Sequence, residues 1–157
     1  QKEGKFIKTY NAECDYLREN AIALSGFPKE KIELSNQIFI SSFFRHYGKD
    51  LKEVRPVTET SGKFSLKKVG SKKKYTTEVK VLSKKADSFS VQCRITQGFR
   101  HQVRSHLAWA CIPVKNDCLY NFSAKNKELK ENLKFKAVSL EFFNPFSNQN
   151  VSFFYDE

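Results

Sequence analysis

Two arginines and two histidines are closely spaced in one short stretch of the chain. Arg100 and Arg104 are four residues apart, so a helix would place them one turn apart on one side. His101 and His106 lie in the same stretch. Guanidinium groups bind anionic groups through paired hydrogen bonds, so arginines in this pattern could contact an anion such as phosphate. The alternative is an amphipathic helix whose arginines simply face solvent.

The elements that would position these side chains follow from the hydrophobic spacing. Apolar and polar residues alternate over residues 91–95, which predicts a half-buried strand. Gly98 then ends the strand, and glycine can adopt a positive φ at little cost. From Phe99 the period changes, because Phe99, Val103 and Leu107 recur every four residues, as on the buried side of a helix.

A proline and an Asn-Asp pair define the far end of this stretch. We expect Pro113 to end the helix, because proline cannot continue it. Asn116 and Asp117 predict a turn, since Asn tolerates a left-handed conformation there. The Asp117 carboxylate is expected to accept hydrogen bonds from nearby backbone N–H groups.

The rest of the chain predicts mostly strands. Asp15 is expected to cap a short helix over residues 16–24. Residues 45–57 are polar and end at Arg55-Pro56, which predicts a loop, and residues 121–132 predict a loop or a short helix. The succession indicates one α+β domain over residues 1–157. Strands are expected over residues 6–14, 37–44, 75–81, 89–95, 135–142 and 151–155, the third and fourth forming a hairpin.

Composition indicates a globular, strongly basic protein. Hydrophobic residues make up 39% of the 157 and phenylalanine alone numbers 15, which excludes a disordered chain. Lysine and arginine total 28 against 17 acidic residues, a formal charge of +11. A surplus of that size favours a polyanionic partner, nucleic acid above all. A basic soluble protein without such a partner is the alternative.

Lysines gather between residues 63 and 85. This run holds nine lysines and one acidic residue, Glu78. It can be a surface that contacts phosphates. It can equally be a solvated strand edge whose lysines prevent pairing with another sheet.

The cysteines indicate a reducing environment. Cys14, Cys93, Cys111 and Cys118 form no C-x-x-C pair, and we expect them to be reduced core residues rather than metal ligands. This favours a cytoplasmic location and no metal. No signal peptide or long apolar run appears, so export and membrane insertion are not expected. Nothing in the sequence requires more than a monomer.

Two stretches resemble motifs of the RluA family of RNA pseudouridine synthases. The family's second motif reads Lys-x-Tyr-x-Ala, as residues 8–12 do here. Its third motif reads roughly Thr-Gly-Arg-Thr-His-Gln-Ile-Arg-x-His-Leu, then Pro-Ile-x-Gly-Asp-x-Leu-Tyr. This chain has Phe99-Arg100 where the family has Arg-Thr. It also has Asn116 in place of the usual Gly before Asp117, and Asn121 in place of the usual Gly after Tyr120. The residues that match the third motif are Gly98, His101, Gln102, Val103, Arg104, His106, Leu107, Pro113, Val114, Asp117, Leu119 and Tyr120.

The resemblance implies an activity and a fold. Such enzymes detach uracil from its ribose, rotate it and rejoin it through carbon 5, with neither metal nor organic cofactor. The fold implied is a mixed, mostly antiparallel sheet with flanking helices. The whole protein would modify uridine in ribosomal or transfer RNA.

The resemblance also implies roles for particular residues. Arg104 would pair with the nucleophilic aspartate. Tyr10 would lie against the base and is proposed to help remove the carbon-5 proton. Leu119 matches a residue that helps line the uracil pocket, although a plain core leucine is an equal alternative. His101 and His106 would be scaffold hydrogen bonders. Phosphate contacts are expected at Arg100, Lys72, Lys73 and Lys74.

The family's first motif, His-Arg-Leu-Asp followed by Thr-Ser-Gly, carries the nucleophile and would lie before Gln1. The chain has no methionine and opens with glutamine. We therefore expect it to be the C-terminal part of a catalytic domain, with residues 15–60 resembling an insertion, and to be inactive alone. Thr60-Ser61-Gly62 repeats part of the first motif, but Val57 stands where the aspartate would be. The main rival is a non-catalytic RNA-binding module on the same scaffold. A second rival is a basic interaction domain with no RNA role.

Overall fold

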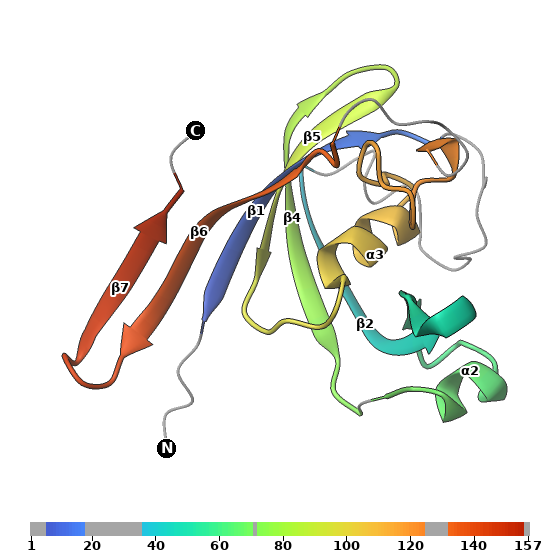
Figure 1. Ribbon diagram of the computed structural model, residues 1–157, viewed down its shortest axis with the longest axis horizontal. Helices are drawn as coiled ribbons and strands as arrows, with labels where there is room; N and C mark the ends of the chain where they lie inside the picture. Colours follow the sequence, from blue (N-terminus) through green and yellow to red (C-terminus); the bar gives the residue numbers. More distant parts are fainter. Residues whose placement is uncertain (1–5, 18–35, 71, 125–131, 156–157) are drawn as a thin grey trace.

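One antiparallel sheet dominates the fold. The computed structural model describes residues 6–17, 36–70, 72–124 and 132–155. Seven strands lie in the order β3-β2-β4-β5-β1-β6-β7, and every neighbouring pair is antiparallel, which confirms the predicted α+β class (Figure 1). The elements are β1 (Ile7–Asp15), β2 (Gln37–Tyr47), the 3-10 helix η1 (Lys49–Leu51), β3 (Glu53–Val57), α2 (Lys63–Lys67), β4 (Tyr75–Lys84), β5 (Ser88–Ile95), α3 (Gln102–Trp109), the 3-10 helix η2 (Phe122–Ala124), β6 (Phe135–Asn144) and β7 (Gln149–Phe154).

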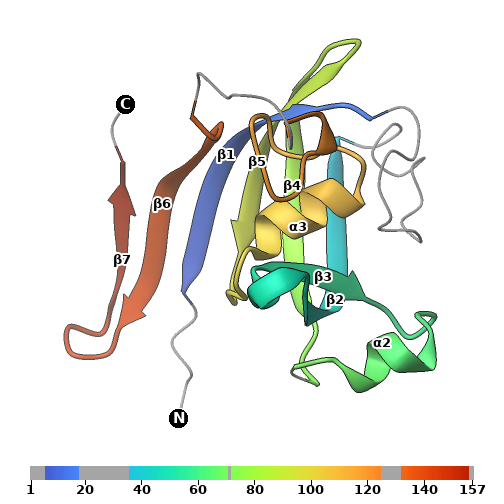
Figure 2. The same cartoon turned by 45° about the vertical axis from the view of Figure 1, so that its right-hand side comes forward.

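The core lies between α3 and one face of the sheet. Val103 and Leu107 of α3 are buried against residues that alternate along the central strands, as a sheet with one covered face requires. Figure 2 shows α3 in front of β5, β4 and β2, while β1, β6 and β7 lie to one side. The sheet residues of this core are Ala12, Cys14, Ile38, Ile40, Val79, Phe89, Val91, Cys93 and Ile95.

The strand predictions are confirmed, but the loop predicted over residues 45–57 is wrong. There β2 continues to Tyr47, η1 follows, and β3 pairs with β2. Pro56 made this stretch look irregular. A proline cannot donate a ladder hydrogen bond, yet β3 is an edge strand with only one partner, where that loss is tolerated.

The helix predicted to begin at Phe99 begins three residues later. His101 precedes α3 with a φ of 51°, and Phe99 lies before the helix, stacked on Phe44 with ring centroids 5.0 Å apart. Gly98 follows the end of β5, as predicted, and is not among the described residues with positive φ. The helix ends at Trp109, before Pro113, and Asn116 has the predicted left-handed conformation with a φ of 63°.

Two other predicted segments can be compared with the structure over only some of their residues. Asp15 ends β1, Tyr16 and Leu17 are not helical, and the rest of the predicted helix over 16–24 lies outside the described residues. The predicted stretch 121–132 contains η2, and residues 125–131 lie outside the described part as well.

The described residues also bear on the predictions about cysteines, membrane-spanning helices and metal ligands. Cys14 and Cys93 are buried as predicted, whereas Cys118 is exposed, so its predicted core position is wrong. No helix in this part of the chain is long and apolar enough to cross a membrane. Within the same ranges, no three His, Cys, Asp or Glu side chains gather as metal ligands would.

Candidate functional site

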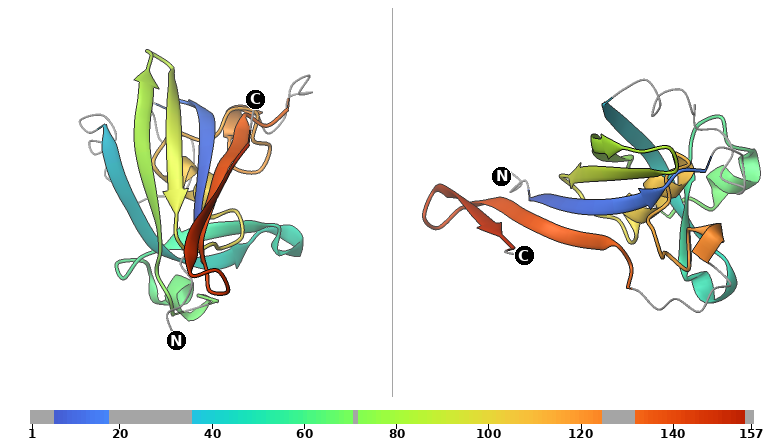
Figure 3. Two further views of the ribbon diagram at one scale, coloured as in Figure 1. Left: turned by 90° about the vertical axis from the view of Figure 1, so that its left-hand side faces the viewer. Right: turned by 90° about the horizontal axis from the view of Figure 1, so that it is seen from above.

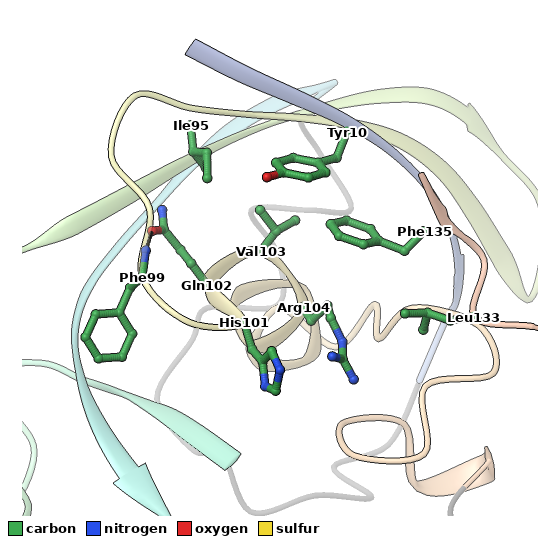
Figure 4. Close-up of a pocket in the computed structure, with 9 residues that line it drawn as sticks. All are labelled: Tyr10, Ile95, Phe99, His101, Gln102, Val103, Arg104, Leu133 and Phe135. Atoms are coloured by element: carbon green, nitrogen blue, oxygen red, sulfur yellow. Dashed lines mark hydrogen bonds between the residues drawn. The ribbon is translucent and has the colours of Figure 1, made fainter. Parts of the chain in front are cut away.

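A cavity of about 270 Å³ opens beside the first turn of α3. Its volume is near the lower end for small-molecule pockets, a size suited to one flat heterocycle. Tyr10 and Arg104, which are far apart in the sequence, both line it (Figure 4). The lining residues are Tyr10, Ile95, Phe99, His101, Gln102, Val103, Arg104, Leu133 and Phe135.

Two stacked aromatic rings form one wall of the cavity. Tyr10 lies on β1 opposite Cys93 of β5, which fixes its position along the sheet. Its ring stacks on Phe135 of β6, with centroids 4.9 Å apart and planes 10° apart. Burial, followed by the nearby Tyr155, raises the pKa of the Tyr10 hydroxyl, which is therefore protonated at neutral pH. This wall offers a flat apolar surface on which a base can stack.

Arg104 is fixed by a bidentate ion pair with Asp117. Its Nε donates to Oδ2 at 2.8 Å and its Nη2 to Oδ1 at 2.6 Å. Burial alone would lower the pKa of Arg104, but the hydrogen bonds and charge of Asp117 outweigh burial, and the pKa is raised. A guanidinium has five N–H donors and Asp117 takes two, so three remain for another acceptor. Nη1 has no partner among the described residues.

The Asn-Asp turn positions this carboxylate. The Asp117 side chain is fully buried, and its Oδ1 also accepts the backbone N–H groups of Leu119, at 3.0 Å, and Tyr120, at 3.2 Å. The predicted bonding to backbone N–H groups is thus confirmed. The ion pair with Arg104 is an addition that spacing alone did not indicate. Asp117 is committed to these four hydrogen bonds, so it orients Arg104 and is unavailable as a nucleophile.

The two histidines of the stretch have different surroundings. His106 is buried, and its ring nitrogens lie 2.9 Å from Ser42 Oγ and 2.8 Å from Thr77 Oγ1. Burial lowers the pKa of His106 to about 3, so the ring is neutral and joins α3 to β2 and β4. His101 borders the cavity, and its Nδ1 lies 3.2 Å from Tyr120 Oη. Burial, then the charges of Arg104 and Arg100, lower the pKa of His101.

Gln102 anchors the start of α3. Its Nε2 donates to the Thr76 carbonyl at 3.0 Å and to Thr77 Oγ1 at 3.2 Å, and its Oε1 accepts the Phe99 N–H at 3.0 Å. These bonds attach the loop before α3 to β4. Because Arg104 lies two residues after Gln102, these hydrogen bonds also help to position its guanidinium beside the cavity.

The cavity therefore combines a stacking wall with a positive charge. None of its nine lining residues carries a carboxylate. The arrangement can bind a flat, polar ring and stabilise a negative group beside it. Among the described residues, no Asp, Glu, Cys or Lys side chain lines the cavity.

The remaining predicted residues lie elsewhere. Leu119 is partly buried against the cluster of Phe44, Val54 and Tyr120 and does not line the cavity. Arg100 is exposed, and its Nη1 lies 3.4 Å from the Leu51 carbonyl oxygen. Their predicted contacts with substrate stay predictions.

The three predicted lysines lie between α2 and β4. Lys72, Lys73 and Lys74 are exposed, and Lys74 forms an ion pair with Glu59. Since β4 lies between β2 and β5, lysines on it do not protect a sheet edge. The edge-protecting interpretation therefore does not apply to β4, while a contact with phosphate stays a prediction.

Sequence reasoning missed three contributors to the site. Phe135 and Leu133 line the cavity, and Asp117 pairs with Arg104. Phe135 was predicted to begin a strand, but without the pairing of β6 with β1 nothing placed it against Tyr10. The register of these strands supplies that contact.

Comparison with known proteins places the chain in a family. Residues 1–109 match the family described as RNA pseudouridylate synthase, a region that includes Tyr10 and Arg104. A search of curated proteins found no match. Among solved structures, the human RNA pseudouridylate synthase domain containing 1 is similar, with a TM-score of 0.69 and 15% identity over 98% of this chain and 55% of that one. The human RNA pseudouridylate synthase domain containing 4 is also similar, with a TM-score of 0.58 and 15% identity over 96% and 57%.

These structural similarities concern the fold. At such identity they show a shared architecture and carry no residue roles. This chain spans little more than half the length of either solved structure.

Proposed function

The chain belongs to the RNA pseudouridylate synthase family, and we propose that its whole protein isomerises uridine to pseudouridine in ribosomal or transfer RNA. The observation that carries the proposal is the convergence of Tyr10 and Arg104 on one cavity of base size. The two residues come from β1 and α3, more than 90 positions apart in the sequence. The motif resemblance further supports the RluA group within the family.

In this proposal the wall of Tyr10 and Phe135 receives a uracil that has left the RNA stack. The ring of Tyr10 lies against the base, and its hydroxyl helps to remove the carbon-5 proton. Arg104, held by Asp117, uses its remaining N–H donors to keep a nucleophilic aspartate ionised. The basic surface, including Arg100 and Lys72 to Lys74, contacts the RNA backbone.

We propose further that the nucleophilic aspartate belongs to a part of the whole protein outside these 157 residues. Two facts support this: no carboxylate lines the cavity in the described part, and the chain spans just over half of its structural neighbours. The 157 residues alone would then bind RNA without converting it. A cytoplasmic, monomeric protein fits the cysteine content and the sequence.

The same observation favours a second candidate. A cavity without a carboxylate also suits a non-catalytic RNA-binding module that kept the scaffold. The two candidates differ in one prediction, since the module would bind RNA and never convert uridine.

Tritium release from RNA labelled at carbon 5 of uridine tests the proposal. We expect the whole protein to release tritium and its Arg104→Ala variant to lose this activity. Arg94→Ala is a matched control, because Arg94 is an exposed arginine of β5 whose neighbours Cys93 and Ile95 point to the core. If the whole protein bound total cellular RNA but released no tritium, the non-catalytic binding module would be favoured instead.

A further inference from the structure

His101 lines the cavity in a backbone conformation that histidine rarely adopts. Its φ of 51° and ψ of 19° are left-handed, which costs free energy in a residue with a side chain. This conformation turns the chain at the start of α3 and places His101 in the cavity wall. Figure 4 shows its ring beside the Arg104 guanidinium, on the side of the cavity opposite Tyr10. Strained residues cluster at functional sites, so the conformation indicates a role for this imidazole beyond packing.

Tyr120 holds the ring of His101 in place. Its hydroxyl oxygen accepts the backbone N–H of Val54 at 2.9 Å and lies 3.2 Å from His101 Nδ1. Val54 belongs to β3, which runs across the direction of β4 and β5 in the left view of Figure 3. The rings of His101 and Tyr120 meet edge to face, with centroids 5.8 Å apart and planes 83° apart. The Arg104 guanidinium carbon lies 5.3 Å from the centre of the same Tyr120 ring, so one tyrosine positions both side chains.

The hydrogen bonds of Tyr120 determine which nitrogen of His101 carries the proton. Tyr120 is buried, and among the described residues its hydroxyl contacts the Val54 N–H and His101 Nδ1. A tyrosine hydroxyl has one proton to donate, and a buried donor without an acceptor is costly. Because the Val54 N–H is itself a donor, the Tyr120 O–H must point to Nδ1, which accepts it. Burial raises the pKa of Tyr120 and lowers the pKa of His101, so both groups are neutral at pH 7. A neutral imidazole that accepts at Nδ1 carries its proton on Nε2.

The Nε2–H group of His101 is an unused donor in the described part of the chain. The hydrogen bond that its ring makes there is the contact of Nδ1 with Tyr120. A base stacked on the wall of Tyr10 and Phe135 would direct its ribose and phosphate toward the opposite side of the cavity, where His101 lies. Ribose and phosphate carry oxygens that accept hydrogen bonds from proteins. The donor therefore lies where these groups of a bound nucleotide would be.

We propose that His101 positions the substrate by donating a hydrogen bond from Nε2 to a ribose or phosphate oxygen of the nucleotide in the cavity. This inference rests on the proposed function, in which that nucleotide is a uridine of RNA. The neutral state suits the role. A protonated imidazole would attract the nucleophilic carboxylate that Arg104 is proposed to pair with, whereas a neutral donor leaves Arg104 as its partner. The left-handed start of α3 then presents the imidazole to the substrate.

Two substitutions separate the donor from the backbone conformation. His101→Gln keeps an N–H group at about the reach of Nε2, but glutamine tolerates a left-handed φ poorly. His101→Asn tolerates that φ, but its amide is too short to reach the same acceptor. In the whole protein, tritium release from subsaturating total cellular RNA labelled at carbon 5 of uridine should fall at least about 10-fold in His101→Asn. It should stay within about threefold of the wild type in His101→Gln.

A purely structural role for His101 predicts the reverse order, because asparagine would then be the better replacement. That order, or equal rates in the two variants, would overturn the inference. The Tm of each variant is measured alongside. A normal rate in His101→Asn together with a Tm lowered by about 5 °C or more would also overturn it, in favour of a hydrogen bond from Nε2 to another part of the protein.

Nitrogen NMR of the whole protein with isotope-labelled histidine tests the donor without measuring conversion. The His101 signals, identified by their loss in His101→Asn, should show the proton on Nε2 at pH 7. Uridine 5′-monophosphate should shift the Nε2 signal. An equal shift with uridine would identify ribose as the acceptor, and a shift with the monophosphate alone would identify phosphate.

A proton on Nδ1, no shift with uridine 5′-monophosphate, or a shift with uracil alone would overturn the inference. These NMR readouts do not depend on conversion. A failed synthase assay with the expected shifts would therefore count against the proposed function and leave the His101 contact standing.

Discussion

The face of the sheet that carries Tyr10 has two halves with opposite properties. Under α3 the polar groups are paired: His106 contacts Ser42 and Thr77, Gln102 reaches Thr76, and no described buried side-chain nitrogen or oxygen lacks a partner. From Tyr10 to β7 the face borders the cavity, which Arg104 of α3 lines with unused donors, and it carries a row of exposed apolar side chains.

The difference separates stability from function. The half under α3 is closed by residues of this chain, so substitutions of its buried residues outside the cavity, such as His106, should change folding more than chemistry. In the half from Tyr10 to β7, the cavity residues make few contacts that hold the fold together. Substitutions there should therefore change chemistry more than folding. Each prediction below tests this division, and they run from the largest expected free-energy effect to the smallest.

Replacing Arg104 should have the largest effect. Arg104→Lys keeps the charge, but lysine cannot hold Asp117 by two parallel bonds and also offer further donors to a second carboxylate. We expect uridine conversion by the whole protein to fall about 1,000-fold, measured under single turnover. Arg94→Lys should leave the rate within twofold. A comparable loss of uridine conversion in both variants would contradict the placement of Arg104 in the catalytic site.

His106 should make the protein sensitive to acid. Its pKa is about 3 in the fold and near 6.5 in an unfolded chain, so the unfolded chain binds more protons between these values. The free energy of unfolding should therefore fall as pH drops below about 6.5, by up to about 1.4 kcal/mol per pH unit. Urea unfolding of the 157-residue chain at several pH values measures this slope.

The variant His106→Leu should remove that part of the slope and cost about 2–3 kcal/mol at pH 7, because it leaves buried hydroxyl groups with fewer partners. His46→Leu is a control, since His46 is exposed. An unchanged slope in His106→Leu would show that another group causes the acid sensitivity. It would also contradict the conclusion that His106 stabilises the half of the sheet under α3.

Tyr10 should affect chemistry without affecting stability. Tyr10→Phe keeps the ring that stacks on Phe135 and loses the hydroxyl, so kcat should fall about 100-fold while KM changes little. Tyr10→Leu removes the stacking surface and should raise KM as well. A Tyr10→Phe variant with unchanged kcat would show that the residue serves stacking alone.

The lysines before β4 should have the smallest effect. Changing Lys72, Lys73 and Lys74 together to glutamine should weaken RNA binding and reduce its salt dependence by about one unit of slope per lost phosphate contact. The same change at Lys80, Lys84 and Lys85, further along the lysine run, is the matched control. Equal losses would indicate a general charge effect rather than a contact at the start of β4.

Much of this architecture could be predicted from local patterns. Alternating residues identified six of the seven strands, and the spacing of Val103 and Leu107 identified the buried side of α3. Asn116 was correctly predicted to be left-handed because asparagine tolerates that conformation. These features depend on neighbours within a few residues in the sequence.

The errors and omissions depend on distant contacts. β3 was missed because only its pairing with β2 makes a proline-containing segment a strand. The helix start was misplaced because Phe99, apparently part of the helical repeat, instead packs on Phe44 from β2. The pairing of Arg104 with Asp117 needs a return of the chain after α3, which no periodicity reveals.

The most direct test compares the 157-residue chain with the whole protein in one assay. Each is incubated with total cellular RNA labelled at carbon 5 of uridine, and tritium release is measured alongside RNA retention. We predict that both bind RNA and that only the whole protein releases tritium, because the cavity described here lacks a carboxylate nucleophile. Release by the 157-residue chain alone would contradict this account, since these residues would then contain a complete catalytic site.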